Sequence, residues 1–508
     1  MDHLLRWLTS WHRRAPDTVT IGRYGLFGMR SLRVPLFGQD SHLYCVGKSG
    51  QGKSKLLLNV LAQLIQQGQG CGVIDPHSDL ADDLLMHLAS YPKSRPWLSV
   101  PENRARVIYL DPSRTDFVVP TNVLKSSTMT PHKIAENVLD CYKRVYPETL
   151  SEAPRFAQIM RNTLVVLASR GLTLLELEPF LTNARFRHQL LANFPDKQVI
   201  HFFSDQYARW GRDQSIFVSP VLNKVTAYLF QPSVRAALGA SDNVVDFRAI
   251  IDQGKILIGD LGGLTGETQQ LYGSMLVANF QQAAMSRRGT REGARHPYLL
   301  MIDEFPAFVS RDTKTLARIL SEVRKFNCFL CLAHQTLSQT DQRMQGALEN
   351  CDVRLAMATG RGTAHALAQQ LYLPDPSLIK HEVHPDHQER SHPLYEQVQN
   401  QIEMAVQQLM RLKKRHMMVK LVGCDKLRHV KTPNVARSRI TPEQLQVYKK
   451  VLLRRVGKSV AELAQEGVAR EPQKASPKLM TKTAADLSGA SWEDAFYEDM
   501  SAPHSHDN

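Results

Sequence analysis

The sequence contains no apolar run of about 18 residues or more, the length that a helix needs to cross a bilayer. It therefore predicts no transmembrane helix. Residues 1–8 form too short and too polar a stretch for a signal peptide. We expect a cytoplasmic protein, with peripheral attachment at the inner face of the inner membrane as the alternative. Leu4, Leu5, Trp7, Leu8 and Trp11 are spaced to form one apolar face of a helix near the start. We expect this face to pack on its own domain; the alternative is contact with a membrane surface or a partner.

Cysteine is scarce, with 7 in 508 residues, and internal repeats are absent. The cysteines show none of the spacings typical of a metal site. Cys328 and Cys331 lie in an apolar, strand-like run, where residues three apart point to opposite faces. We interpret them as reduced core cysteines, which favours a cytosolic compartment.

Acidic residues are fewer than basic ones, and the net charge of +14 is unevenly placed. Residues 411–458 contain fifteen Lys and Arg but only two acids, a net charge of +13. Residues 486–508 contain six acids and no Lys or Arg. The asymmetry indicates a polyanion near the basic segment, and a separate role for the acidic tail. A solvated basic helix beside a disordered, solubilising tail would give the same pattern.

The most specific motif is the stretch Gly-Lys-Ser-Gly-Gln-Gly-Lys-Ser at residues 47–54, which fits the P-loop pattern. An apolar strand is predicted before it (42–46) and a helix after it (56–65). In this geometry backbone N–H groups surround the β-phosphate, Lys53 reaches the β and γ oxygens, and Ser54 holds Mg²⁺. The alternative is a Gly/Ser turn before an ordinary helix. The expected cofactors are ATP and Mg²⁺, and the expected nucleotide-binding residues are Gly47, Ser49, Gly50, Gln51, Gly52, Lys53, Ser54 and Lys55.

Short, continuously apolar runs recur along the chain, and such runs are typical of parallel strands covered on both faces. Several end in Asp, which places carboxylates at the sheet edge where α/β proteins bind ligands. The predicted fold class is therefore α/β, with a P-loop sheet. The runs lie at 71–75, 106–111, 255–260, 298–303, 329–334 and 352–358.

One of these strands ends in an acidic pair that supplies the second half of an ATPase site. Asp303 is placed to hold Mg²⁺ through water, and Glu304 to orient and deprotonate the attacking water. The next strand ends at Gln335, whose amide is a candidate sensor of the γ-phosphate; the alternative is a polar turn residue.

Phosphoryl transfer also requires positive charge, which ring ATPases take from a neighbouring subunit. Arg324, Arg354 and Arg361 all follow the acidic pair. We favour Arg361 and Arg354 as arginine fingers, against ordinary surface ion pairs.

The predicted organisation has six parts. Residues 128–245 interrupt the strand pattern with helices, and Thr441 and Pro442 open a basic helix as N-cap and first helical residue. The parts are an N-terminal extension (1–30), the first ATPase segment (31–127), an all-helical insertion (128–245), the second ATPase segment (246–440), a basic helical segment (441–472) and a disordered acidic tail (473–508).

With these residues in place, the chain resembles the FtsK/HerA superfamily of hexameric P-loop motors, and within it the coupling-protein ATPases of type IV secretion. The resemblance implies a RecA-like sheet, catalytic Lys53, Ser54, Asp303 and Glu304, and Gln335 as sensor. It also implies a hexamer with DNA in its channel, and relaxase or secretion-channel partners. The segments that carry it are 40–42, 73–80, 219–225, 252–257, 302–305, 319–326 and 334–335.

Two departures from this family are visible. Coupling proteins usually carry N-terminal membrane helices, which this sequence lacks. Residues 355–361 replace the phenylalanine-containing strand and acidic turn of relatives, which leaves the choice of arginine finger open.

The leading functional hypothesis is an ATP-driven motor that moves DNA as the coupling ATPase of a conjugation or mobile-element system. The alternatives are a secretion ATPase that powers protein export or pilus assembly, a HerA-like DNA-processing translocase, and a nucleotide-gated adaptor that recruits relaxase or effector proteins.

Overall fold

The computed structural model describes residues 18–37, 42–150, 153–309, 319–383, 392–424 and 427–470. The chain divides into a unit from Met1 to Arg470 and a second from Glu471 to Asn508, and every described residue belongs to the first. The apolar face predicted near the N-terminus and the acidic tail lie outside the described residues. Within the described ranges, no helix combines the length and the apolar composition that crossing a membrane requires.

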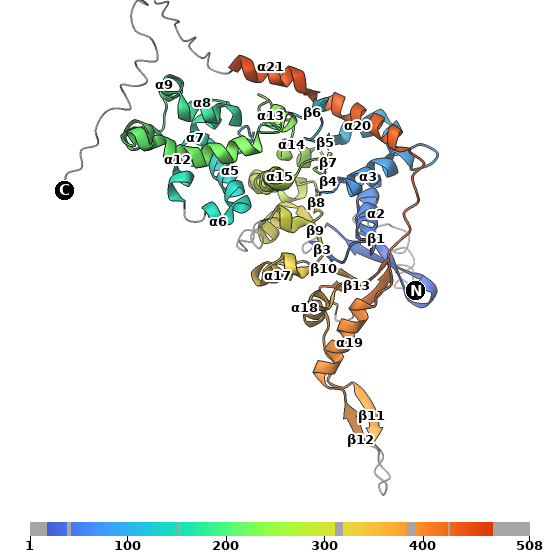
Figure 1. The fold of residues 1–508 in the computed structure, drawn as a ribbon. Coiled ribbons are helices and arrows are strands. Elements are labelled where there is room, and N and C mark those ends of the chain that lie inside the picture. Colours follow the sequence, from blue (N-terminus) through green and yellow to red (C-terminus); the bar gives the residue numbers. More distant parts are fainter. Residues whose placement is uncertain are drawn as a thin grey trace, which may run out of the picture. The chain divides into compact units, whose positions relative to one another are not determined.

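An 11-stranded sheet organises the described chain, in the order β2-β1-β14-β13-β10-β3-β9-β8-β4-β7-β5 (Figure 1). The strands from β10 to β5 run parallel to their neighbours. Every residue of β3, β4, β5, β7, β8 and β9 is buried, as continuously apolar strands require. The predicted α/β fold class is confirmed. The parallel strands are β3 (Leu43–Val46), β4 (Gly70–Asp75), β5 (Val107–Leu110), β7 (Ile256–Asp260), β8 (Tyr298–Ile302), β9 (Cys328–His334) and β10 (Val353–Met357).

Four antiparallel strands extend the sheet beyond β10, and we call them the edge ribbon. They are β1 (Thr18–Tyr24), β2 (Arg30–Pro35), β13 (His416–Leu421) and β14 (Arg428–Lys431). Sequence analysis did not predict them, and β13 and β14 fall inside the basic segment 411–458. The ribbon therefore pairs the first described strands with residues 416–431, which are far away in the sequence.

Helices cover both faces of the sheet. The helices α2 (Lys53–Gln66), α3 (Asp79–Ser90) and α20 (Pro442–Val456) lie on one side, and α14 (Phe247–Asp252) and α15 (Gly266–Ser286) on the other (Figure 1). Thr441 caps α20 through a capping box with Pro442 at the first position, as predicted. The remaining elements outside the insertion are α4 (Pro101–Arg106), α17 (Gln342–Leu348), α18 (Arg361–Leu371), α19 (Val398–Met410), α21 (Val460–Arg470), the hairpin β11 (Ile379–Val383) and β12 (His392–Tyr395), and the pair β6 (Phe117–Val118) and β15 (Lys458–Ser459).

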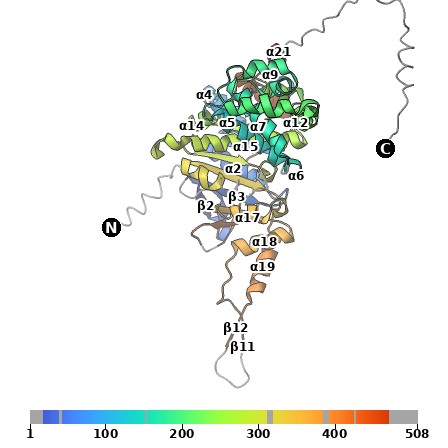
Figure 2. The ribbon, with the colours of Figure 1, turned by 90° about the vertical axis from the view of Figure 1, so that its left-hand side faces the viewer.

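The chain between β6 and β7 is helical, and the helices predicted there are confirmed. Both views group them next to α15 (Figures 1 and 2), and α5 packs directly on α15. Ring contacts among Phe180, Phe202, Phe203, Tyr207 and Trp210 fill the interior of the group. The domain boundaries stay predictions. The helices are α5 (Pro131–Val145), α6 (Pro147–Leu150), α7 (Pro154–Ser169), α8 (Leu177–Thr182), α9 (Ala184–Leu191), α10 (Lys197–His201), α11 (Tyr207–Arg209), α12 (Gln214–Tyr228), α13 (Pro232–Leu238) and α14.

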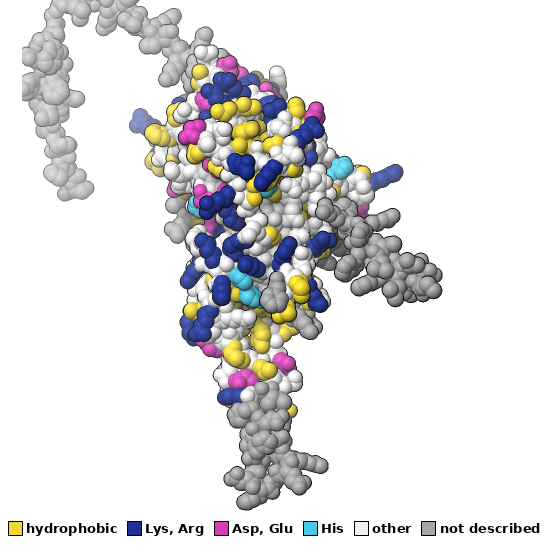
Figure 3. All heavy atoms as spheres, turned by 90° about the vertical axis from the view of Figure 1, so that its right-hand side faces the viewer, with side chains coloured by type: hydrophobic (Ala, Val, Ile, Leu, Met, Phe, Trp, Pro, Cys, Tyr) yellow, Lys and Arg dark blue, Asp and Glu magenta, His cyan; other side chains and the backbone are white. Residues whose placement is uncertain are grey.

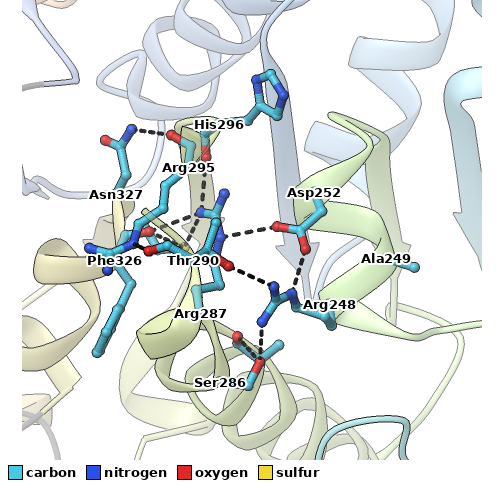
Figure 4. Close-up of polar contacts among 12 residues, drawn as sticks. Arg248, Ala249, Asp252, Ser286, Arg287, Thr290, Arg295, His296, Phe326 and Asn327 are labelled. Carbon is cyan, nitrogen blue, oxygen red and sulfur yellow. Dashed lines mark hydrogen bonds and ion pairs between the residues drawn. The ribbon is translucent and has the colours of Figure 1, made fainter. Parts of the chain in front are cut away.

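A buried arginine holds the amino edge of the sheet together (Figure 4). Arg287, at the end of α15, is fully buried and donates from Nη1 to the carbonyl oxygens of His296 and Phe326, each at 2.9 Å. Its Nε lies 3.1 Å from Oδ1 of Asp252, which also pairs with Arg248. Because a buried cation is tolerated only when it is paired and hydrogen-bonded, this network fixes α14 and α15 to the starts of β8 and β9.

Candidate nucleotide site

The P-loop lies between the carboxyl ends of β9 and β10. The N–H of Gly47 donates to the carbonyl oxygen of His334 (3.3 Å), and the N–H of Lys48 donates to that of Ala358 (3.0 Å). Because β3 pairs with both strands, the loop leaves the sheet at a position flanked on each side.

The backbone of the loop is shaped to hold an anion. Gly50 and Gly52 have φ angles of 79° and 102°, a region that residues with a Cβ rarely adopt. Gly52 is the N-cap of α2, and no side chain caps this helix. The N–H groups of the first helical turn have no partner within the helix, and they carry its positive dipole end. These residues fit the phosphates of a nucleotide.

Lys53 connects the P-loop to the acidic pair. Its Nζ lies 2.6 Å from Oε1 of Glu304 and 3.2 Å from Oδ1 of Asp303, and all three side chains are less than a tenth exposed. Burial lowers the pKa of Lys53, but the two carboxylates more than offset this and raise it above its ordinary value. The lysine is therefore charged, and it faces two carboxylates that directly follow β8.

Glu304 is held in an unusual backbone conformation. Its φ and ψ are 47° and 46°, in the left-handed region that few residues other than Gly adopt. Such conformations cluster at functional sites because the surrounding structure must hold them in place. Here Lys53 contacts one carboxylate oxygen, and Nε2 of Gln339 donates to the other over 3.4 Å.

The strand between the P-loop and the acidic pair ends close to both. Gln335 follows β9, as predicted, but its N–H donates to Oε1 of Gln339 (3.3 Å), and the described contact with Glu304 comes from Gln339. Sequence analysis missed Gln339. The signal for it was the sequence Thr-Leu-Ser-Gln at 336–339, a capping-box pattern in which Oε1 of Gln339 also accepts from the N–H of Thr336 (3.1 Å).

The predicted arginine fingers make contacts of their own. Arg354 donates to the carbonyl oxygens of Cys351 (3.1 Å) and Glu349 (3.0 Å) before β10. Arg361 begins α18, is about two thirds exposed, and pairs with Glu403 at 3.1 Å. Among the described residues, neither contacts Lys53 or Glu304. Their action on a neighbouring subunit stays a prediction. Arg361 is the more exposed of the two side chains.

Ser54 and Asp303 are the predicted ligands of Mg²⁺. Ser54 occupies the first turn of α2, and the carboxylate of Asp303 accepts from Lys53 and from the N–H of Glu304 (3.1 Å). A hydroxyl and one carboxylate match the few protein ligands that Mg²⁺ takes beside phosphate and water. The donor set therefore fits the ion.

Further carboxylates continue the carboxyl edge beyond this pair. Asp75 ends β4 and is fully buried. Burial raises its pKa to about 6 and Asp303 adds to the rise, although the N–H groups of Ala81 and His77 oppose it. Asp260 ends β7 and lies 3.1 Å from Nζ of Lys449, a residue of α20 that is only 5 % exposed. The basic segment therefore supplies a cation to the interior as well as to the surface.

Strand order and site together define the class of fold. The P-loop strand β3 neighbours β9 and β10, and β9 separates it from β8, the strand that ends in the acidic pair. This is a RecA-like P-loop sheet, extended at one edge by the ribbon.

Solved structures share this fold over most of the chain. The bacterial conjugative coupling protein TrwBdeltaN70, in an unbound form, is 17 % identical with a TM-score of 0.58, and the match covers 86 % of this chain and 93 % of that one. VirB4 of Thermoanaerobacter pseudethanolicus is 14 % identical with a TM-score of 0.52, covering 85 % and 98 %. The plasmid coupling protein TrwB in complex with ADP and Mg²⁺ is 16 % identical with a TM-score of 0.52, covering 78 % and 87 %. No family model and no curated protein matches the sequence.

Proposed function

We propose that the chain is an ATPase that moves DNA as the coupling ATPase of a conjugation or type IV secretion system. The observation that carries this proposal is the contact between Lys53 and Glu304 at 2.6 Å, although 251 residues separate them. The contact supports the assignment of Lys53 as the phosphate-binding lysine and Glu304 as the water-activating acid of one site. The fold shared with TrwB, solved with ADP and Mg²⁺, supports the choice of nucleotide.

The mechanism follows from the pairing of Lys53. When nucleotide phosphates occupy the loop, their oxygens compete with Asp303 and Glu304 for the Lys53 ammonium. Glu304 is then released to accept a proton from the attacking water, while Gln339 keeps the second carboxylate oxygen oriented. Mg²⁺, when bound, neutralises charge on the phosphates, and Ser54 and Asp303 are the residues that would hold it.

Assembly completes the site in this proposal. The described contacts around Lys53 contain no arginine, and phosphoryl transfer requires added positive charge. Arg361 of a neighbouring copy is the best candidate, because its side chain is about two thirds exposed and its present partner Glu403 is only half-buried. We therefore expect a ring, most simply a hexamer, that forms on ATP or DNA and is detectable by mass measurement in solution.

The test is the ATP hydrolysis rate at low salt with no DNA, with single-stranded DNA and with duplex DNA. A DNA motor predicts stimulation by at least one of the two, and loss of stimulation as salt rises. An unchanged rate with both would contradict the DNA-motor proposal while leaving the ATPase site intact. That outcome would favour the second candidate, an ATPase for protein export, which the fold shared with VirB4 supports.

A further inference from the structure

The edge ribbon carries a row of basic residues on one face, of which Arg23 and Lys431 are cations. Arg23 of β1 lies directly opposite Lys431 of β14, which lies directly opposite His416 of β13. Residues paired in this way have Cβ atoms about 4.5–5.5 Å apart, and like charges there destabilise the sheet. His429 adds a further basic ring, with its Nε2 3.1 Å from Nδ1 of His416. Because this pairing of like charges lowers the stability of the sheet, we expect the two side chains to serve in binding rather than in folding.

The row lines a hollow of about 960 Å³. Its wall contains Arg23, Tyr24, Arg415, His416, His429 and Lys431, with no acidic residue among the lining residues. In the part of the chain that the structure describes, no carboxylate pairs with Arg23, Arg415 or Lys431. Figure 3 shows Lys and Arg side chains gathered on this side of the molecule with His among them, and few acidic side chains nearby.

Arg415 joins this hollow to the P-loop. Its N–H donates to the carbonyl oxygen of Gln51 at 2.8 Å, and its Cγ lies 3.1 Å from the position that a Cβ on Gly52 would take. The residue has a φ of 70°, a left-handed conformation that needs support from its surroundings. Support comes from the side chain, which donates to the carbonyl oxygen of Thr432 (2.9 Å) and contacts Asn434.

The charge of the hollow identifies the chemistry of its ligand. A pocket for a nucleoside base is mostly apolar, with few polar groups, whereas this wall carries Arg23 on β1, Lys431 on β14 and Arg415 just before β13. Repeated cations with no acidic residue among them are typical of contacts to a phosphodiester backbone.

We propose that the hollow in the edge ribbon binds the phosphodiester backbone of nucleic acid next to the nucleotide site. This inference rests on the proposed function, since it assigns a contact surface to the DNA. Arg415 then links the two ligands, because any shift of Arg415 on backbone binding moves its contacts with Gln51 and Gly52.

The test is equilibrium binding of a fluorescein-labelled oligothymidylate to the full chain across a range of salt concentrations, read by anisotropy. The double variant Arg23→Gln/Lys431→Gln removes two phosphate contacts. The negative slope of log Kobs against log salt should therefore become shallower by about 1.4. The control Arg185→Gln/Lys197→Gln removes the same charge from exposed positions on α9 and α10, and should keep the wild-type slope. Thermal unfolding checks that both variants are folded.

The outcomes separate this inference from the proposed function. If wild type binds the oligonucleotide and the ribbon variant keeps the wild-type slope, the hollow is not a backbone site, although the motor proposal stands. If the variant weakens binding of a fluorescent ATP analogue and leaves the slope unchanged, the hollow serves the nucleotide and the inference is overturned. If wild type neither binds DNA nor responds to it, the motor proposal fails and the inference fails with it.

Discussion

Two groups of cations lie beside the P-loop, and their surroundings differ. Lys53 is buried and contacts two carboxylates, whereas Arg23 and Lys431 are exposed, stand opposite each other and have no acidic partner among the described residues. The first group contains more negative than positive formal charge, and in the proposed mechanism nucleotide phosphates compete with its acids for Lys53. The second group repels itself, and an anion from outside relieves that repulsion. Pairing therefore distinguishes a cation whose charge is balanced by acids within the fold from cations that have no acidic partner among the described residues.

The largest expected effect concerns the paired group. Glu304→Gln removes the group that accepts the proton from water, so ATP turnover should fall on the order of 10²–10⁴-fold. Binding of a fluorescent ATP analogue should persist, because Lys53 keeps its charge and the P-loop is unchanged. Glu292→Gln, at an exposed position in a short turn before β8, is the matched control. A turnover rate for Glu304→Gln close to that of the control would contradict the assigned role.

A second buried cation tests whether pairing stabilises the fold. Lys449→Met leaves Asp260 and Asp82 without their cation, and should lower the free energy of unfolding by about 3–5 kcal/mol. The neighbouring Lys450 is exposed. Lys450→Met should therefore change the free energy of unfolding by less than about 0.5 kcal/mol. Denaturant titrations measure both. Equal changes in the two variants would mean that the pairing of Lys449 with Asp260 and Asp82 does not contribute to the free energy of unfolding.

A buried histidine, His42, makes the stability of the fold depend on pH. The ring of His42 accepts at Nδ1 from the N–H of Leu330 and bonds at Nε2 to the carbonyl oxygen of Leu320, and burial lowers its pKa to about 4. The unfolded chain gains this proton near pH 6.5 and the folded chain only near pH 4, so stability is lost as pH falls through that window. The loss attributable to His42 is roughly 3 kcal/mol. His42→Gln should show a smaller loss of unfolding free energy between pH 7 and 4; an equal loss would exclude this origin.

The smallest expected effect concerns the ribbon. Lys431→Gln removes the like-charge neighbour of Arg23, so at low salt the free energy of unfolding should stay constant or rise by about 0.2–1 kcal/mol. This is the opposite sign to Lys449→Met. If Lys431→Gln destabilises the fold to a similar extent, the ribbon cations are structural and the contrast between the two groups disappears.

The parts of the site that follow local patterns could be predicted from sequence. The P-loop is a contiguous motif, and Asp303 and Glu304 directly follow a continuously apolar strand. Both depend on the rule that parallel strands present their carboxyl ends at one edge. The helix begins at Lys53 rather than at residue 56, because the turn carrying the loop is itself the start of the helix.

The parts that depend on distant pairing could not be predicted. Arg23 pairs with Lys431 across more than 400 positions of sequence, and the short ribbon strands carry cations where a buried strand would carry apolar residues. The burial of Lys449 depends on the packing of α20 against β5 and α3. No local sequence pattern predicts this packing. The contact of Gln339 with Glu304 likewise depends on the turn after β9.

The measurement that tests the central claim most directly is the ATP hydrolysis rate of Lys53→Ala beside wild type. The account predicts hydrolysis by wild type and no measurable turnover by Lys53→Ala, with thermal unfolding confirming that the variant is folded and Lys450→Ala retaining the wild-type rate. Hydrolysis that survives in folded Lys53→Ala would contradict the account, because the P-loop and the acidic pair would then not form the active site.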